Sequence, residues 1–175
     1  GTRALSNGTL TCASVTHTSG DLSIGTGYLV IATGTYTFTA GSITINNGVN
    51  LSVGAFSSAN TGTRSISYGT GSITTNNTGT VWNVTGVTGF TYTGTSNVII
   101  SNNTATAITV TNTGTAANAM NFNIINGTYT LTLTTNNRYN NLNFTGFAGT
   151  VAFAATLKAS PSYNCAAEAA EDNAT

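Results

Sequence analysis

Side chains able to do acid–base chemistry are scarce in this chain of 175 residues, which has one histidine and four carboxylates. His17 stands four residues before Asp21, and the remaining carboxylates, Glu168, Glu171 and Asp172, lie near the C-terminus. Glycoside hydrolysis needs two carboxylates across the scissile bond, and only Asp21 precedes the C-terminal segment. A Ser-His-Asp arrangement would have to use His17 and Asp21, yet no nucleophile-elbow pattern accompanies them. We therefore predict that the protein is not an enzyme and that His17 lies in a surface loop.

Metal and phosphate sites are not predicted either. Two cysteines and one histidine give no zinc-site spacing, and no acidic loop matches a calcium site. The glycines are scattered among threonines and never precede a Lys-Ser/Thr pair, so they do not form a phosphate-binding loop. The sequence predicts no cofactor, and we interpret the glycines as turn residues.

The two cysteines, Cys12 and Cys165, are disulfide candidates, because such bonds persist in oxidising, extracellular settings. A disulfide requires Cα atoms within about 7 Å of each other. In a solenoid the two residues would lie at opposite ends, which favours a bond between neighbouring subunits over an intrachain bond that needs the C-terminal segment to run back. In a β-sandwich, whose termini are often close, an intrachain bond is favoured instead. Free thiols are the third alternative.

Asn-x-Ser/Thr sequons are the next group of candidate sites. Their number agrees with chance for a chain so rich in Asn, Ser and Thr, so the count is no evidence for glycosylation. They would still allow a dense glycan coat if the chain meets the machinery. The sequon asparagines are Asn7, Asn50, Asn76, Asn83, Asn102, Asn126, Asn143 and Asn173.

Four aromatic residues are candidates for stacking on sugars: Tyr68, Trp82, Tyr92 and Tyr139. The alternative is that aromatic residues at alternating positions belong to the core, and we favour that alternative.

The elements that must position these residues are predicted to be strands. Apolar residues alternate with threonine in segments such as 35–39, 42–45, 107–111 and 128–133, and this period of two is typical of strands with one buried face. Asn-Asn and Asn-Gly pairs between the segments mark turns. Pro161 is the only proline, which suits a body of hydrogen-bonded ladders.

Internal repetition favours one all-β architecture over another. The segment 1–6 (GTRALS) recurs as 62–67 (GTRSIS), which gives Arg3 and Arg64 equivalent positions, and Asn turns recur at 46, 76, 102 and 126. Irregular spacing of about 20 to 30 residues fits the coils of a parallel β-solenoid (β-helix), in which aligned Asn side chains would bond from coil to coil. A β-sandwich or jelly roll is the alternative. We predict a β-structured body over 1–157, then a linker at 158–162 that opens an acidic, Ala-rich tail or end cap over 158–175.

The composition of the chain restricts the kinds of partner that it can bind. Charged residues make up 5% of the chain, and the formal net charge is zero. Four scattered cations cannot form the dense basic surface that nucleic-acid binding needs. The apolar runs are far shorter than a spanning helix, so membrane insertion is not expected. A nearly uncharged surface with many β edges instead predicts association with other copies of the chain.

Segments 65–74 (SISYGTGSIT), 80–83 (TVWN), 122–131 (FNIINGTYTL) and 142–150 (LNFTGFAGT) together resemble the Thr/Gly/Asn-rich repeat proteins of marine phages and environmental bacteria. The resemblance covers roughly residues 64 to 150 and transfers no functional residue. It implies a fibre or surface-display role. We expect a structural subunit of an extracellular filament, appendage or virion fibre, located at the cell or virion surface. The alternative is a carbohydrate-binding tail-fibre or adhesin domain with glycans as partners.

Overall fold

The computed structural model describes residues 1–5, 8–25, 28–31, 33–85, 88–94, 97–103, 107–113, 120–134, 138–154 and 158–164, and contains strands and no helix among them. The strands form three sheets. Sheet 1 contains, in spatial order, β1 (Thr2–Leu5), β4 (Asp21–Ile24), β7 (Gly41–Ile45), β10 (Arg64–Ser67) and β13 (Phe90–Thr93). Sheet 2 contains β2 (Thr9–Cys12), β5 (Tyr28–Ile31), β8 (Asn50–Val53), β11 (Ser72–Thr75), β14 (Asn97–Ile100), β16 (Met120–Ile124), β18 (Arg138–Asn143) and β20 (Lys158–Asn164). Sheet 3 contains β3 (Val15–His17), β6 (Thr35–Phe38), β9 (Ala55–Ser57), β12 (Gly79–Val84), β15 (Ile108–Asn112), β17 (Thr130–Leu133) and β19 (Thr150–Phe153).

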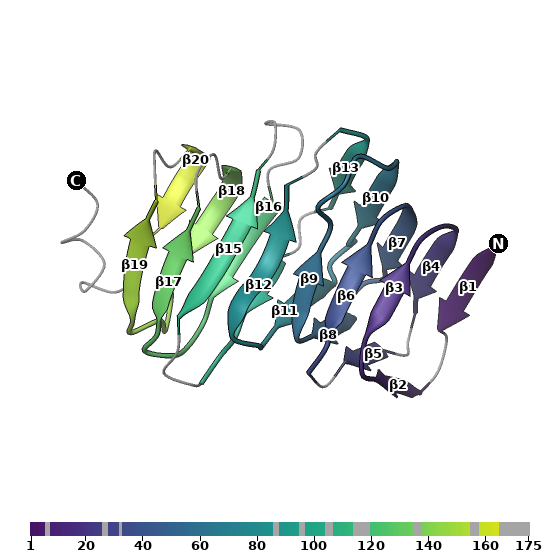
Figure 1. Ribbon diagram of the computed structural model, residues 1–175, viewed down its shortest axis with the longest axis horizontal. Helices are drawn as coiled ribbons and strands as arrows, with labels where there is room; N and C mark the ends of the chain where they lie inside the picture. The colour runs from purple at the N-terminus through teal and green to yellow at the C-terminus, as the bar shows by residue number, and fades with distance from the viewer. Residues whose placement is uncertain are drawn as a thin grey trace.

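The protein is a parallel β-solenoid. From β1 to β15 the chain visits sheet 1, sheet 2 and sheet 3 in turn, and from β16 on the described strands alternate between sheets 2 and 3; each strand pairs in parallel with the strand one coil later (Figure 1). The coils differ in length: Thr2 pairs with Asp21, 19 residues on, and Trp82 with Val110, 28 residues on. Since every strand pairing is parallel, the antiparallel sandwich that the sequence left open does not form.

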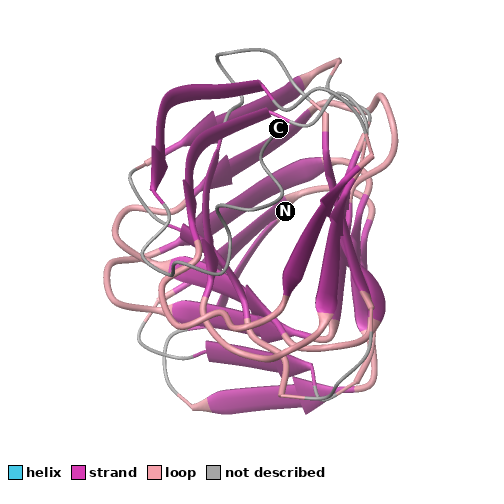
Figure 2. Cartoon of the chain, turned by 90° about the vertical axis from the view of Figure 1, so that its left-hand side faces the viewer, coloured by secondary structure: helices cyan, strands magenta, loops and turns pink. Residues whose placement is uncertain are grey.

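Alternation of side chains fills the interior. In β6 the side chains of Tyr36 and Phe38 have no exposed surface, whereas the threonines between them are partly exposed. Figure 2, viewed along the length of the molecule, shows the three sheets as walls around this core. The rings of Phe56 and Trp82 stack at 4.6 Å between centroids, and Trp82 meets Phe122 of sheet 2 edge-on at 5.5 Å. Aromatic contacts therefore join one wall to another across the core.

The predicted Asn stacking occurs at the corner between sheets 2 and 3. The Asn102 Nδ2 donates to the carbonyl oxygen of Asn77 (2.6 Å), and the Asn102 backbone N–H donates to the Asn126 side-chain oxygen (2.9 Å). Asn46 and Asn47 lie at a different corner, after β7, where the Asn47 side chain accepts a hydrogen bond from the Thr70 N–H (2.9 Å). The recurrence of Asn thus marks coils, although the asparagines serve two corners.

Arg3 and Arg64 are not equivalent, contrary to the sequence repeat. Arg3 aligns with Leu22 in β4, and this register continues to Ile66 rather than to Arg64. Arg64 aligns with Gly41, whose φ of 103° is one that glycine adopts readily and whose backbone lies so close to that of Gly20 that a Cβ would clash with it. The matching GTR segments are out of step by two residues because the intervening coils differ in length.

Residues 158–162, expected to be a linker, lie instead in β20, which pairs with β18. Tyr139 pairs with Ala159 and Asn141 with Ser162, so one extra residue is inserted on β20 beside Pro161. Proline lacks a backbone donor and is tolerated at edge strands and bulges, and β20 offers both. The body therefore continues to Asn164, and the acidic residues 165–175 lie outside the described residues.

Candidate functional site at the N-terminal end

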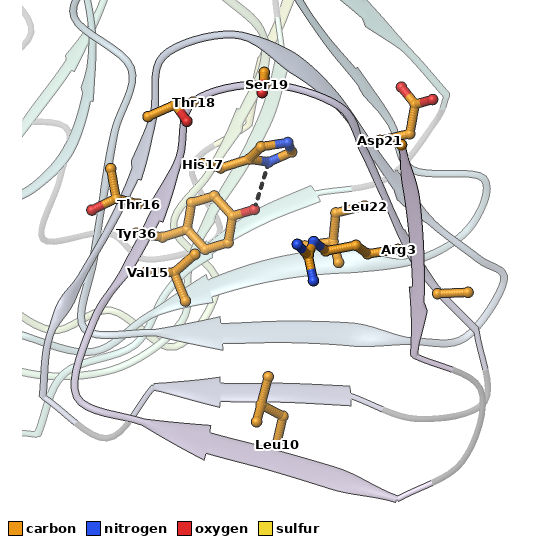
Figure 3. Close-up of a pocket in the computed structure, with 12 residues that line it drawn as sticks. Arg3, Leu10, Val15, Thr16, His17, Thr18, Ser19, Asp21, Leu22 and Tyr36 are labelled. Carbon is orange, nitrogen blue, oxygen red and sulfur yellow. Dashed lines mark hydrogen bonds between the residues drawn. The ribbon is translucent and has the colours of Figure 1, made fainter.

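The first coil encloses a hollow of about 690 Å³ at the end of the solenoid. Arg3 of β1, Leu10 of β2, Val15 of β3 and Leu22 of β4 line it, each from a different strand (Figure 3). Inward residues of later coils, such as Ile43 and Leu51, are fully buried. Leu10 has 44% of its surface exposed, so apolar surface faces solvent here.

His17 and Tyr36 close the inner side of the hollow. The His17 Nδ1 lies 2.9 Å from the Tyr36 hydroxyl (Figure 3). Its Nε2 lies 3.0 Å from the Gly20 carbonyl oxygen. A carbonyl can only accept, so Nε2 carries a hydrogen. Burial raises the pKa of Tyr36 well above its usual range, so its phenol keeps the proton that it donates to Nδ1. Both ring nitrogens are thus occupied by structural bonds.

The expected position of His17 in a surface loop is wrong. His17 ends strand β3 and is 9% exposed, because its ring packs on Phe38 at 4.9 Å. Asp21 does not join it: its carboxylate accepts hydrogen bonds from the Ser42 and Thr2 hydroxyls on the outer face of sheet 1. The structure therefore pairs His17 with Tyr36, a partner that no pattern in the sequence indicated.

This end of the molecule combines apolar and polar side chains with open sheet edges. Its hollow is lined by aliphatic residues, Arg3, His17 and Asp21 among others, and the outer edges of β1, β2 and β3 pair with no other described strand. Free sheet edges and exposed apolar side chains are both stabilised by adding another strand layer.

No family model, curated protein or solved structure matches the chain. The resemblance to phage and bacterial repeat proteins therefore stays an expectation. Among the described residues, no three His, Cys, Asp or Glu side chains gather closely enough to hold a metal ion. That part of the chain also has no helix able to span a membrane.

The candidate glycan-stacking residues lie mostly in the core. Tyr68, Trp82 and Tyr139 have no exposed surface, so their ring faces are not available to a sugar. Tyr92 is half-buried and packs edge-on against Tyr68 at 5.2 Å. The core alternative, which the alternation favoured, holds for the three buried residues.

The sequon asparagines other than Asn102 fall into three groups. Asn50 and Asn76 are exposed; Asn83, Asn126 and Asn143 are half-buried; Asn7 and Asn173 lie outside the described residues. Asn102 is 4% exposed and its Nδ2, the atom a glycan would modify, donates to two corner carbonyls. The folded chain therefore cannot present Asn102 for modification.

Cys12 is half-buried in β2, at the N-terminal end, and forms no disulfide with any described residue. Its proposed partner Cys165 lies outside the described residues, one position after the last strand. The disulfide between Cys12 and Cys165 therefore stays a prediction.

Proposed function

We propose that the protein is a structural subunit of an extracellular filament, appendage or virion fibre and that it works by self-assembly. The observation that carries this proposal is the open N-terminal end, where three parallel strand edges surround a hollow with an exposed leucine. Solenoid ends must be capped or stacked, and an interface between unlike ends extends indefinitely instead of closing.

The surface composition supports the same proposal. Outward positions carry mainly Thr, Ser and Asn, and the whole chain has four cations and four carboxylates. Such a surface lacks the repulsion that keeps many proteins monomeric. The proposed location is the outside of a cell or virion, where the exposed Asn50 and Asn76 sequons would also be accessible.

Sedimentation velocity and electron microscopy test the proposal. Purified protein at increasing concentration should shift to larger species, and the images should show filaments of uniform width. A concentrated sample that sediments as a monomer and shows discrete particles would count against self-assembly.

A carbohydrate-binding fibre or adhesin domain is the second candidate. Its support is an outward column of carboxamides on sheet 2, where Asn97, Asn121 and Asn141 pair in register. Amides in a regular row can bond the repeated hydroxyls of a glycan. Binding on a glycan array that is lost in Asn97→Ala, from protein that stays monomeric, would favour this function over assembly.

A further inference from the structure

Aromatic rings from successive coils form a continuous chain of contacts inside the core. Neighbouring rings in this chain have centroids 4.6 to 6.2 Å apart, the range in which aromatic side chains pack directly against one another. Every member is buried, so the chain is shielded from water along its length. Its members, in order of contact, are His17, Tyr36, Phe56, Trp82, Phe122 and Tyr139.

Trp82 lies at the centre of the chain and is one of its easily oxidised members. Its indole N–H donates to the Asn112 side-chain oxygen at 3.1 Å. A carboxamide oxygen is a weak base, so an oxidised Trp82 keeps this proton and becomes a radical cation. An uncompensated charge in an apolar core is unfavourable. The electron vacancy is therefore drawn to any neighbouring ring that can lose its positive charge by releasing a proton.

Two tyrosines are placed alike around Trp82. Tyr36 is reached through Phe56, whose ring stacks on Trp82 at 4.6 Å and on Tyr36 at 5.7 Å. Tyr139 is reached through Phe122, whose ring meets Trp82 at 5.5 Å and Tyr139 at 5.0 Å, both edge-on. Each tyrosine is thus separated from the indole by a single phenylalanine.

The two tyrosines differ in what receives the phenolic proton. The Tyr36 hydroxyl donates to His17 Nδ1 at 2.9 Å, which is close enough for direct proton transfer (Figure 3). The His17 Nε2–H is held by the Gly20 carbonyl, so protonation at Nδ1 gives an imidazolium that keeps both hydrogen bonds. The Tyr139 hydroxyl is buried and has no hydrogen-bond partner among the described residues. Tyr36 can therefore become a neutral radical, and Tyr139 cannot.

The other features of the core single out the same pair. The buried hydroxyls of Tyr68 and Tyr129 also have no partner within the described part of the chain. Tyr36 and His17, in contrast, both line the N-terminal hollow of about 690 Å³, and His17 is 9% exposed. A small oxidant or reductant that enters this hollow comes close to the pair.

We propose that Tyr36 and His17 form a redox-active pair that collects a one-electron oxidation of the aromatic core as a neutral tyrosyl radical. The partner is a one-electron oxidant, such as a peroxyl radical or a high-valent metal complex. This activity is independent of the proposed self-assembly. It keeps an oxidising equivalent at one site beside the hollow, where a small reductant can remove it.

The step balances in electrons and protons. The oxidant takes one electron from Trp82, and an electron from Tyr36 then restores the indole through the Phe56 contact. The O–H bond of Tyr36 breaks as its proton forms an N–H bond at His17 Nδ1. The products are the Tyr36 radical, the His17 imidazolium and the reduced oxidant. A one-electron reductant such as ascorbate reverses both transfers.

Flash photolysis of the full chain tests the assignment. A ruthenium(II) polypyridyl complex with persulfate generates the ruthenium(III) oxidant, and transient absorbance and electron paramagnetic resonance follow the radicals. Wild-type protein should form a tyrosyl radical. Tyr36→Phe should lose that signal and retain a longer-lived tryptophan radical. Tyr139→Phe is the matched control, since its ring is also one phenylalanine away from Trp82, and should form the same tyrosyl radical as wild type.

The role of His17 has its own readout. His17→Gln keeps an acceptor for the phenol but replaces the imidazole with a much weaker base, so radical formation should slow by about 100-fold. Circular dichroism checks that the variants fold. Wild-type protein in heavy water tests the same proton transfer without a substitution, and its radical should form more slowly than in water. The proposal is overturned by an undiminished tyrosyl radical in Tyr36→Phe, by equal losses in Tyr36→Phe and Tyr139→Phe, or by equal rates in water and heavy water.

Discussion

At the residue scale, the most unusual group in the core is the guanidinium of Arg64, which is 1% exposed. Its Nη1 donates to the carbonyl and hydroxyl oxygens of Ser58 (2.8 and 2.6 Å), and its Nε donates to the Gly62 carbonyl (2.8 Å). The Phe90 ring lies 5.3 Å from its Cζ. Arg64 thus fastens the long corner between β9 and β10 to the core.

Replacing Arg64 should therefore cost much of the stability. Arg64→Met keeps the apolar stem but leaves buried carbonyls without donors, each worth about 1 to 3 kcal/mol, so we expect a loss of about 3 kcal/mol. Urea unfolding followed by circular dichroism measures it. Arg3→Met is the control, since Arg3 is exposed, and should change the stability by less than about 0.5 kcal/mol. Equal effects of the two substitutions would refute the role assigned to Arg64.

Buried tyrosine hydroxyls give a second test with opposite signs. The Tyr139 hydroxyl is buried and has no hydrogen-bond partner among the described residues, whereas the Tyr36 hydroxyl bonds His17. Tyr139→Phe should raise the free energy of unfolding by about 1 kcal/mol, because it removes an unsatisfied polar group. Tyr36→Phe should lower it by about 1 kcal/mol, because it leaves His17 Nδ1 unpaired. Thermal melts of both variants test these predictions. A shift of the melting temperature in the same direction for both variants would contradict the opposite roles assigned to the two hydroxyls.

At the scale of elements, the sequence predicted the strands well and the register poorly. Alternation identified the inward residues of β6, β15 and β17, because period two is local information. The alignment of one coil with the next depends on the lengths of the corners, and these lengths vary. The GTR repeat therefore predicted a wrong alignment of Arg3 with Arg64. The Asn turns at the corner between sheets 2 and 3 did predict contacts between neighbouring coils. The strand β20 was missed because Pro161 signals a break, although a neighbouring edge and a bulge accommodate it. His17 was misplaced because its burial depends on Tyr36 and Phe38 from the next coil.

A proline inside the body should behave differently from Pro161. Thr74 lies in β11, which pairs on both sides with β8 and β14, and its side chain faces outward. Thr74→Pro removes a ladder hydrogen bond in a central strand and should cost about 3 kcal/mol or more. Thr74→Ala is the control for the lost side chain and should cost less than about 1 kcal/mol. Equal melting temperatures of the two variants would mean that β11 is not a central strand.

At the scale of the whole molecule, each coil contacts mainly its two neighbours, so the core is a continuous column of side chains rather than a closed globule. The interior coils are covered on both sides, and the N-terminal coil is covered on one. The buried core of the body and the exposed apolar surface at its end therefore have the same origin. Stacking of the next coil buries Leu51 and Ile73, and the absence of a preceding coil leaves Leu10 exposed.

The buried tyrosines make the whole column sensitive to alkali. Burial raises the pKa of Tyr129 to about 12 and also raises the pKa values of Tyr36, Tyr68, Tyr92 and Tyr139. Below about pH 9 both the folded and the unfolded chain hold these phenolic protons, so stability should not depend on them. Above about pH 10 the unfolded chain releases phenolic protons that the folded chain retains. The free energy of unfolding should therefore fall by up to about 1.4 kcal/mol per pH unit for each buried tyrosine.

The urea midpoint should therefore be constant near neutrality and fall steeply between about pH 10 and 12, and the tyrosinate absorbance that these five tyrosines contribute should appear mainly as the chain unfolds. The double variant Tyr129→Phe, Tyr139→Phe has two fewer such groups and should show a shallower fall. A midpoint that stays level through that range would show that the phenols are not buried.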